Sequence, residues 1–282
     1  MKKAYSKDIW RSIKRGRKRF LSILIITALG VAMFTGLRAA CEDLRYSADK
    51  FFDEQKLFDI CVVSTLGLTD DDVEALLQVL GVEEAEGIYN KNVTVTVSQK
   101  EQTAEVRSFY ANGLNQPYIL EGTLPGAANE IAVTQNYLKD SGKEIGDTLV
   151  FEEELEEEEE AAFLSGEYVI TAAVIDPMDV NGSESAVAFR SAKTTEYTFF
   201  ITPDAVLSDI YTAVYLKLSS LEDVVCYSDE YEEGVKEVVE IIESQIKEQR
   251  EQARYDEIVQ DANKEIADAE EEMNQKLEEA KQ

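Results

Sequence analysis

Residues 20–37 read FLSILIITALGVAMFTGL, and none of these eighteen side chains carries a charge. An α-helix rises about 1.5 Å per residue, so the stretch would cover roughly 27 Å, close to the ~30 Å hydrocarbon core of a bilayer. A buried helix of a soluble protein rarely runs this long without a polar face. The stretch therefore predicts a transmembrane helix, which we place at residues 20–40.

The charges on the two sides of this stretch predict its orientation. The chain has 28 Lys and Arg against 57 Asp and Glu, a formal net charge of −29. Residues 1–19 hold nine basic residues and one acid, a net charge of +8, which leaves −37 for the rest of the chain. Basic residues beside a membrane helix stay in the cytoplasm. We therefore expect a plasma-membrane protein with a cytoplasmic N-terminus and an extracytoplasmic chain after about residue 40. The basic arm suits anionic lipid headgroups and not nucleic acid.

A cleaved signal peptide is the main alternative for the same stretch. Its apolar region usually has about 7–15 residues and its basic region is short, whereas both are longer here. Ala39 and Ala40 before Cys41 resemble the cleavage site of a lipoprotein, but Arg38 stands where such a site has an apolar residue. We therefore favour an uncleaved anchor.

Residues 1–19 predict a cytoplasmic amphipathic arm. Tyr5, Ile9 and Ile13 recur every four residues, Trp10 lies beside them, and basic residues occupy the other side. This pattern is typical of a short helix that lies in the membrane interface with Trp at headgroup depth. A plain positive flank without a helix of its own is the alternative interpretation.

A stripe of small residues lies within the predicted span. Ala28, Ala32 and Gly36 recur every four residues, and such a spacing lets another helix approach closely. We expect the span to pack against a partner helix, although Ala and Gly are also common in anchors that stand alone.

Beyond the membrane, residues 41–56 predict a helical stalk, because large apolar residues continue at about seven-residue spacing among charges. Short strands mixed with short helices then predict an α+β extracytoplasmic domain over residues 57–230. Thr69 and Asp72 resemble a capping box that opens a helix at 70–80. Strands are expected at 57–65 (buried), 93–97 (half-buried), 105–111 (after a turn near 100–101), 130–134, 148–151, 167–175, 197–202 and 212–218.

Two features bear on metal and disulfide chemistry. Residues 152–160 hold eight glutamates and one leucine. Calcium sites need a turn with Asp, Asn and Gly at alternating positions, so we interpret this run as a solvated loop. The chain has no His, which excludes His-based metal and catalytic sites. Three cysteines are too few for a disulfide framework; a bridge between Cys61 and Cys226 stays open, and buried thiols are the preferred interpretation. We expect no metal, no cofactor and no catalytic residue.

Residues 231–282 predict a coiled coil. Spacings of three and four alternate over most of the range, at Val235, Val238, Ile242, Ile246, Ala253, Val259, Ala262, Ile266, Ala269, Met273 and Ala280. This seam includes four alanines and a polar Gln249, so one such helix should not be stable alone. We expect a partner strand, either a return arm beyond Gln282 or a second copy.

This order of parts resembles the N-terminal portion of FtsX-like (MacB-like) ABC transporter permeases, in particular the Gram-positive subgroup with an extracytoplasmic coiled coil. The resemblance is carried by GVEEAEG at 81–87, LEGTLPG at 120–126, NEIAV at 129–133, IGDTL at 145–149 and YVITAAVID at 168–176. Thr123 stands where the pattern has Arg, and Ala172–Ala173 where it has Val–Gly. These segments are turn and packing signals: Gly122, Pro125, Gly146 and Asp147 suit turns whatever the function.

The resemblance implies a MacB-like periplasmic core and a permease that passes the work of a separate cytoplasmic ATPase to its extracytoplasmic domain. In that family the motion serves efflux, lipoprotein release or control of a cell-wall hydrolase. The implied partners are the ATPase, the remaining permease helices or a second permease copy, the bilayer, and a hydrolase or lipoprotein. The chain has no phosphate-binding G-x-x-x-x-G-K-[ST] loop, so we expect no enzyme. A single-pass receptor or adhesin with a coiled-coil stalk is the alternative.

Overall fold

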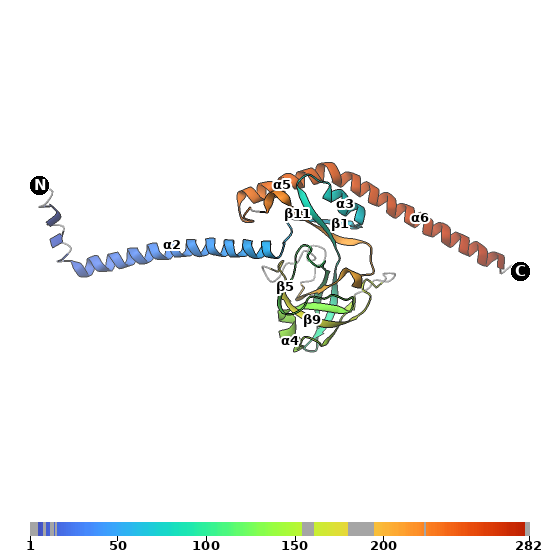
Figure 1. Ribbon diagram of the computed structural model, residues 1–282, viewed down its shortest axis with the longest axis horizontal. Coiled ribbons are helices and arrows are strands. Elements are labelled where there is room, and N and C mark those ends of the chain that lie inside the picture. Colours follow the sequence, from blue (N-terminus) through green and yellow to red (C-terminus); the bar gives the residue numbers. More distant parts are fainter. Residues whose placement is uncertain are drawn as a thin grey trace. The chain divides into compact units, whose positions relative to one another are not determined.

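The computed structural model describes residues 5–7, 10–11, 14, 16–153, 161–179, 195–222 and 224–279. The chain divides into two compact units, Met1–Lys50 and Phe51–Gln282. Nearly all of the regular structure lies in the second unit, whose mixture of strands and helices confirms the α+β class. Figure 1 shows α2, the two sheets and the run of helix that ends at α6.

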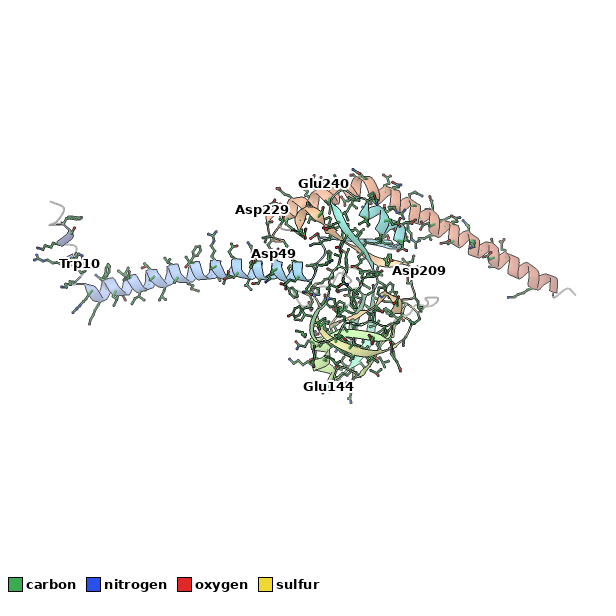
Figure 2. All side chains as sticks on the ribbon, in the orientation of Figure 1. Trp10, Asp49, Glu144, Asp209, Asp229 and Glu240 are labelled. Atoms are coloured by element: carbon green, nitrogen blue, oxygen red, sulfur yellow. The ribbon has the colours of Figure 1, made fainter. Side chains whose placement is uncertain are left out.

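α2 (Arg17–Glu54) includes the predicted span and all but the last two residues of the predicted stalk in one helix. It is the one helix among the described residues that is long and apolar enough to cross a membrane. A signal sequence can have the same length and apolar character. Its side chains project on all sides (Figure 2), and none is fully buried. Two hydroxyls within the span bond back to the helix: Thr27 Oγ1 donates to Ile23 O at 2.9 Å and Thr35 Oγ1 to Val31 O at 2.8 Å. Such bonding lets a hydroxyl sit in an apolar environment.

The smaller sheet is antiparallel, with β11 (Tyr211–Leu218) between β1 (Ile60–Leu68) and β2 (Val82–Ile88). α3 (Asp70–Leu77) and α5 (Asp229–Ile242) pack on one of its faces. The buried side chains of that layer are Ile60, Leu68, Leu76, Val79, Val214, Leu216, Leu218, Leu221, Val238 and Ile242. α5 therefore completes the core of this sheet.

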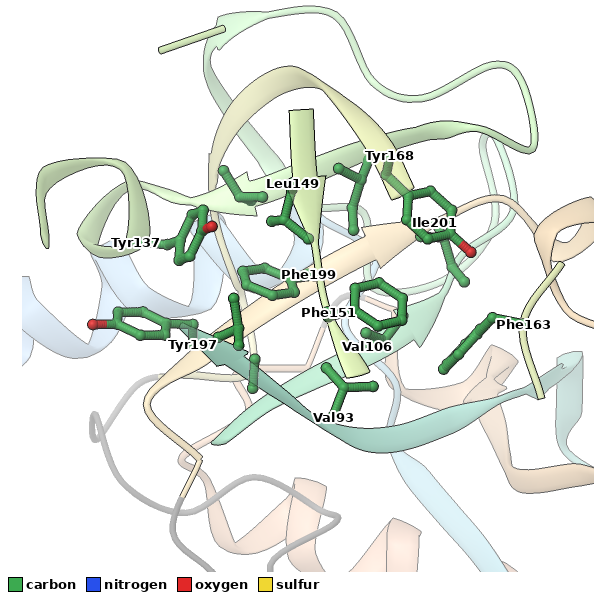
Figure 3. Packing of buried hydrophobic residues seen from close by; sticks show 14 of the residues in the cluster. Val93, Val106, Tyr137, Leu149, Phe151, Phe163, Tyr168, Tyr197, Phe199 and Ile201 are labelled. Carbon is green, nitrogen blue, oxygen red and sulfur yellow. The ribbon is translucent and has the colours of Figure 1, made fainter. Parts of the chain in front are cut away.

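The larger sheet has the strand order β5-β9-β6-β10-β4-β3-β8, with β7 also paired to β9. Its strands are β3 (Asn90–Val97), β4 (Lys100–Ser108), β5 (Tyr118–Gly122), β6 (Glu130–Thr134), β7 (Thr148–Val150), β8 (Glu152–Glu153), β9 (Glu167–Ile175) and β10 (Tyr197–Ile201). α4 (Gln135–Ser141) follows β6. One face of the sheet carries the main core, where Phe199 and Tyr137 contact edge to face at 4.8 Å between ring centroids (Figure 3).

The strands predicted at 130–134 and 167–175 are confirmed to the residue, and those at 148–151, 197–202 and 212–218 to within one. The predicted turn near 100–101 was wrong. Ser98 and Gln99 make it instead, with φ of 50° and 67°, a left-handed pair that suits a two-residue hairpin. β1 also begins later than predicted and is not a buried strand: it lies at the edge of its sheet, and Val63 and Leu66 are exposed.

The sequence did not predict β2, β5 or α4. The first two coincide with segments interpreted as turn signals. Gly81 and Gly122 do have positive φ, 98° and 86°, but each adjoins or ends a strand. Gly146 (φ 98°) and Asp147, whose Oδ2 accepts from the Glu144 amide at 2.9 Å, confirm the predicted turn there.

The glutamate run at 152–160 begins in a strand. Glu152 and Glu153 form β8, contrary to the loop interpretation, and pair with β3. The Glu153 carboxylate accepts from the amides of Ala162 and Phe163 and lies 3.5 Å from Lys91 Nζ. Residues 154–160 lie outside the described part of the chain. No disulfide joins Cys61 to Cys226.

A continuous run of helix follows the sheets. α5 passes through one π-helical turn, Glu243–Lys247, into α6 (Glu248–Glu279). The predicted coiled-coil seam is wrong for its first half, because Val235, Val238, Ile242 and Ile246 belong to the core under the smaller sheet. From Val259 to Met273 the seam lies on the surface, and Ala280 lies outside the described residues. A helix turns about 100° per residue, so the six-residue step from Ala253 to Val259 places the two stripes on different faces.

Candidate functional site: the connections of α2 and α6 to the sheets

The residues that the sequence singled out for the arm and the span lie on the surface. Tyr5 and Trp10 are helical and exposed, while Ile9 and Ile13 lie outside the described residues. Ala28, Ala32 and Gly36 share one exposed face of α2, and nothing lies within 4 Å of a Cβ built on Gly36. The roles predicted for both sets remain predictions.

The end of α2 is fixed by a Schellman motif. The Leu57 amide donates to Phe52 O at 2.9 Å and the Lys56 amide to Asp53 O at 3.0 Å, and Lys56 has a φ of 50°. Glycine is the usual residue at this left-handed position. The motif ends the helix sharply without a glycine, and the chain turns directly toward β1.

This end of α2 is bonded to the loop that precedes β5. The Asn115 amide donates to Lys56 O at 3.0 Å, the Gln116 amide to Gln55 O at 2.9 Å, and the Phe58 amide to Asn115 Oδ1 at 3.0 Å. The ring of Phe51 lies 5.8 Å from the ring of Tyr118. Residues 51–58 are therefore held by backbone hydrogen bonds and ring contacts and do not form a loose linker.

Glu86 of β2 binds the same loop through a hydrogen bond to its backbone. Its Oε2 accepts from the Leu114 amide at 2.7 Å, and a Cβ on Gly113 would collide with its carboxylate. Burial raises the pKa of Glu86 to about 7, and the neighbouring Glu84 charge adds to the rise, while the Leu114 hydrogen bond and Lys56 oppose it. The carboxylate that binds the loop therefore titrates near neutral pH.

Asp59 joins the chain that arrives from α2 to the helix that leaves the sheets. Its side chain is 2% exposed; Oδ2 accepts from the Leu218 amide at 2.7 Å, and Oδ1 lies 3.1 Å from Lys217 Nζ. Oδ1 also accepts from Tyr231 Oη at 2.6 Å. Burial and this hydrogen bond raise the pKa of Tyr231. One carboxylate thus ties the start of β1, the end of β11 and the first turn of α5.

A buried ion cluster lies on the face of β4 opposite the main core. Arg107 donates to Glu105 Oε1 at 2.8 Å from Nη2 and to both oxygens of Asp176 at 3.1 Å from Nη1, and all three side chains are at most 2% exposed. Its guanidinium lies 5.6 Å from the Phe200 ring centroid. Burial alone would lower the pKa of Arg107, but the charges of Asp176 and Glu105 outweigh it and raise that pKa.

The ion cluster lies close to the smaller sheet. Burial raises the pKa of Tyr215 in β11 to about 12 against the opposing charge of Arg107, and Tyr215 stacks on Phe58 at 4.6 Å. Phe58 belongs to the junction at residues 51–59, so Tyr215 contacts this junction and also interacts with the charge of Arg107.

Two arginines fix the start of α6 on the smaller sheet. Arg250 Nε donates to Asp72 Oδ1 at 2.7 Å, and Asp72 Oδ2 accepts from the Thr69 amide at 2.8 Å, which confirms the predicted Thr69–Asp72 pairing at the start of α3. Arg254 Nε donates to Leu66 O of β1 at 3.3 Å and its Nη1 to Glu257 at 3.1 Å. Both side chains are largely buried.

The sequence analysis did not single out the residues of the ion cluster or of the two helix connections, although a local pattern marks some of them. Glu105 and Arg107 place opposite charges two apart on a strand, and hence on one face. Arg250 and Arg254 are the only arginines of an acidic helix. Asp59, Glu86 and Tyr231 left no such signal, because their partners lie up to 172 residues away in the chain.

The chain matches no protein-family model, and no curated protein matches it. Among solved structures it is similar to the extracellular domain of the noncanonic ABC-type transporter YknZ from Gram-positive bacteria, with 7% sequence identity and a TM-score of 0.37, over 61% of this chain and 80% of that one. It is also similar to the periplasmic region of MacB from Actinobacillus actinomycetemcomitans, with 12% identity and a TM-score of 0.38, over 65% and 75% of the two chains.

Proposed function

We propose that this chain is a permease-type subunit of an ABC transporter, in which a separate cytoplasmic ATPase drives motion of the extracytoplasmic sheets and of α6. In this proposal residues 1–19 are cytoplasmic, α2 crosses the plasma membrane, and residues after about 40 are outside. The chain itself catalyses no reaction and holds no cofactor. Efflux, lipoprotein release and control of a cell-wall hydrolase are the outputs that the sequence resemblance implies.

The observation that carries this proposal is the rigid junction at residues 51–59. Backbone hydrogen bonds hold Gln55 and Lys56, directly after α2, to the loop before β5, and Asp59 continues the connection to α5. A displacement of the last turn of α2 would therefore be passed to the smaller sheet and not lost in a flexible linker. A transmitted motion needs such a connection, whereas a simple anchor does not.

The basic arm provides the test, because the proposal gives it a partner. Trp10→Glu places a charge on the exposed Trp10 position, where Trp10→Phe keeps an aromatic ring. Both variants are expressed in the native membrane with the intact permease, and the co-purified ATPase and its ATP turnover are measured. We expect Trp10→Glu to lower both and Trp10→Phe to preserve them. Equal recovery and turnover in all three proteins would show that the arm is only a topogenic signal. A tight homodimer that recovers no ATPase would favour a receptor or adhesin.

The orientation has a test of its own. Cys41 is exposed on α2 and falls just outside the membrane in the proposed topology. A membrane-impermeant maleimide should label Cys41 in intact cells that express the Cys61→Ser, Cys226→Ser variant. It should not label Ser6→Cys in a variant that also carries Cys41→Ser, Cys61→Ser and Cys226→Ser. Label at Ser6, or a mature chain that begins near Cys41, would contradict an uncleaved anchor with a cytoplasmic N-terminus.

A further inference from the structure

α6 presents two different faces, and the sheets use only one of them. Arg250, Arg254 and Glu257, together with the half-buried Ala253, lie on the face that contacts α3 and β1. Side chains at these positions recur every three or four residues and so share one side of the helix. The opposite side is left uncovered from Tyr255 onward.

The uncovered side carries a regular apolar stripe. Its members follow steps of four and three residues in strict alternation: Tyr255, Val259, Ala262, Ile266, Ala269 and Met273. All six are exposed, with Ile266 at 58% and Met273 at 57%. Such alternation gives the a and d positions of a heptad repeat, with Val259, Ile266 and Met273 at a and Tyr255, Ala262 and Ala269 at d. The stripe is therefore built to meet another helix.

The charges beside the stripe decide what kind of helix can bind. No Lys or Arg occupies an e or g position between 255 and 276, whereas Asp256 and Glu270 occupy e positions. Lys264, the one lysine in the middle of this stretch, falls at an f position on the outer side. The e and g residues of paired helices face one another across the seam. A second copy of α6 would therefore bring acidic flanks against acidic flanks and repel.

The size of the d residues further restricts which helices can bind the stripe. Ala262 and Ala269 leave shallow positions in the stripe. Where one helix has a small residue, the core reaches protein density when the facing residue is large. The matching helix therefore carries large aliphatic residues opposite these alanines.

We propose that the exposed stripe of α6 is the docking surface for an α-helix of a separate protein, with Leu or Ile at its a and d positions and Lys or Arg at e and g. The partner lies outside the cell if the proposed topology holds. The binding chemistry itself depends only on α6, so it can be tested apart from the transporter function.

The test uses the full chain in lipid nanodiscs and two synthetic helical peptides of four heptads, about 28 residues. Both peptides have Leu at a and d; one has Lys at e and g, and the matched control has Glu there. We expect the Lys peptide to bind one to one with a micromolar Kd and to weaken about tenfold or more as NaCl rises from about 0.05 M to about 0.5 M. The Glu peptide should not bind measurably.

Two variants of the chain give a matched control for the face of the helix. Ala269→Asp places a charge in the stripe, and Ala267→Asp makes the same change at an exposed b position two residues away. We expect Ala269→Asp to weaken the Lys peptide at least about tenfold and Ala267→Asp to change its Kd less than about twofold. The melting temperature of the sheets should be the same in both, because neither residue is buried.

Several outcomes would overturn the proposal. Equal binding of the two peptides, or equal effects of the two variants, would show that the stripe and its flanking charges do not select a partner. A dimer of the chain alone that is lost in Ala269→Asp would show that a second copy occupies the stripe. Loss of Lys-peptide binding when the return arm expected beyond Gln282 is present would show that this arm occupies it. None of these outcomes would bear on ATPase recovery by the arm, so failure here is distinct from failure of the proposed function.

Discussion

Removal of the Arg107 charge should destabilise the sheets strongly. Arg107→Met keeps much of the side-chain volume but leaves Glu105 and Asp176 buried together without a cation. Breaking a buried ion pair in this way costs about 3–5 kcal/mol, because an uncompensated charge stays in a low-dielectric site. In a domain of this size each kcal/mol shifts the melting temperature by about 2–4 °C. We therefore expect a loss of roughly 6–20 °C.

The assay must report the sheets and not the helices. The only tryptophan is Trp10 in the arm, so its fluorescence does not follow the unfolding of the sheets. Near-UV circular dichroism of the buried tyrosines does, because Tyr137, Tyr168 and Tyr215 are buried within the two sheets. Thermal unfolding is measured on the full chain in detergent, with and without the substitution.

A charge-free triple variant is the matched control. Glu105→Gln, Arg107→Met and Asp176→Asn together remove the two carboxylates along with the guanidinium. If uncompensated charge is the cause, the triple variant should recover at least about 2 kcal/mol relative to Arg107→Met alone. A triple variant no more stable than the single one would refute the electrostatic reasoning, and a single variant that loses less than about 1 kcal/mol would refute the importance of the cluster.

The other predictions concern single positions. Because the pKa of Glu86 is raised to about 7 by burial first and by Glu84 second, the native state binds more protons than the unfolded state between pH 4.5 and 7. The free energy of unfolding should therefore fall by about 1–2 kcal/mol over this window, after allowance for solvent screening. Glu86→Gln should remove that slope in urea titrations at several pH values, while Glu83→Gln on the exposed face of the same strand should retain it. Gly122→Ala should cost about 1–3 kcal/mol, because φ is +86° and the new Cβ would meet Thr171 O; an unchanged melting temperature would contradict the close approach. Tyr231→Phe should cost about 1–3 kcal/mol by removing a donor to buried Asp59, which a melt of the full chain measures.

The strands with strict alternation were predictable from sequence, and so was the capping pair at Thr69. In each, the signal is local and the burial of one face follows from it. β2 and β5 were missed because their sequences are rich in Glu and Gly, and their pairing with β11 and β9 is set by tertiary contacts. The end of α2 was predicted to within two residues, but the Schellman motif that makes it was not, because Lys56 adopts a left-handed conformation in which glycine is usual.

The helical C-terminal stretch shows where periodicity alone falls short. A spacing of three and four predicts an apolar stripe but does not say what covers it. Val238 and Ile242 face the smaller sheet, while Val259 and Ile266 face outward, and the sequence gives both sets the same pattern. The six-residue step between Ala253 and Val259 is the one local sign that the stripe changes face.

The two arginine contacts at the start of α6 determine the direction in which each later side chain of the helix points. Arg250 and Arg254 fix the rotation of the helix about its own axis, since each bonds to a different element of the sheet layer. Each added residue turns the remainder of a helix by about 100° and advances it by about 1.5 Å. The direction in which the exposed stripe faces therefore depends on the number of residues between it and Arg254. A single inserted alanine after Glu257 would turn the same side chains by about 100° about the helix axis, while the sheets and the helix before the insertion stay unchanged.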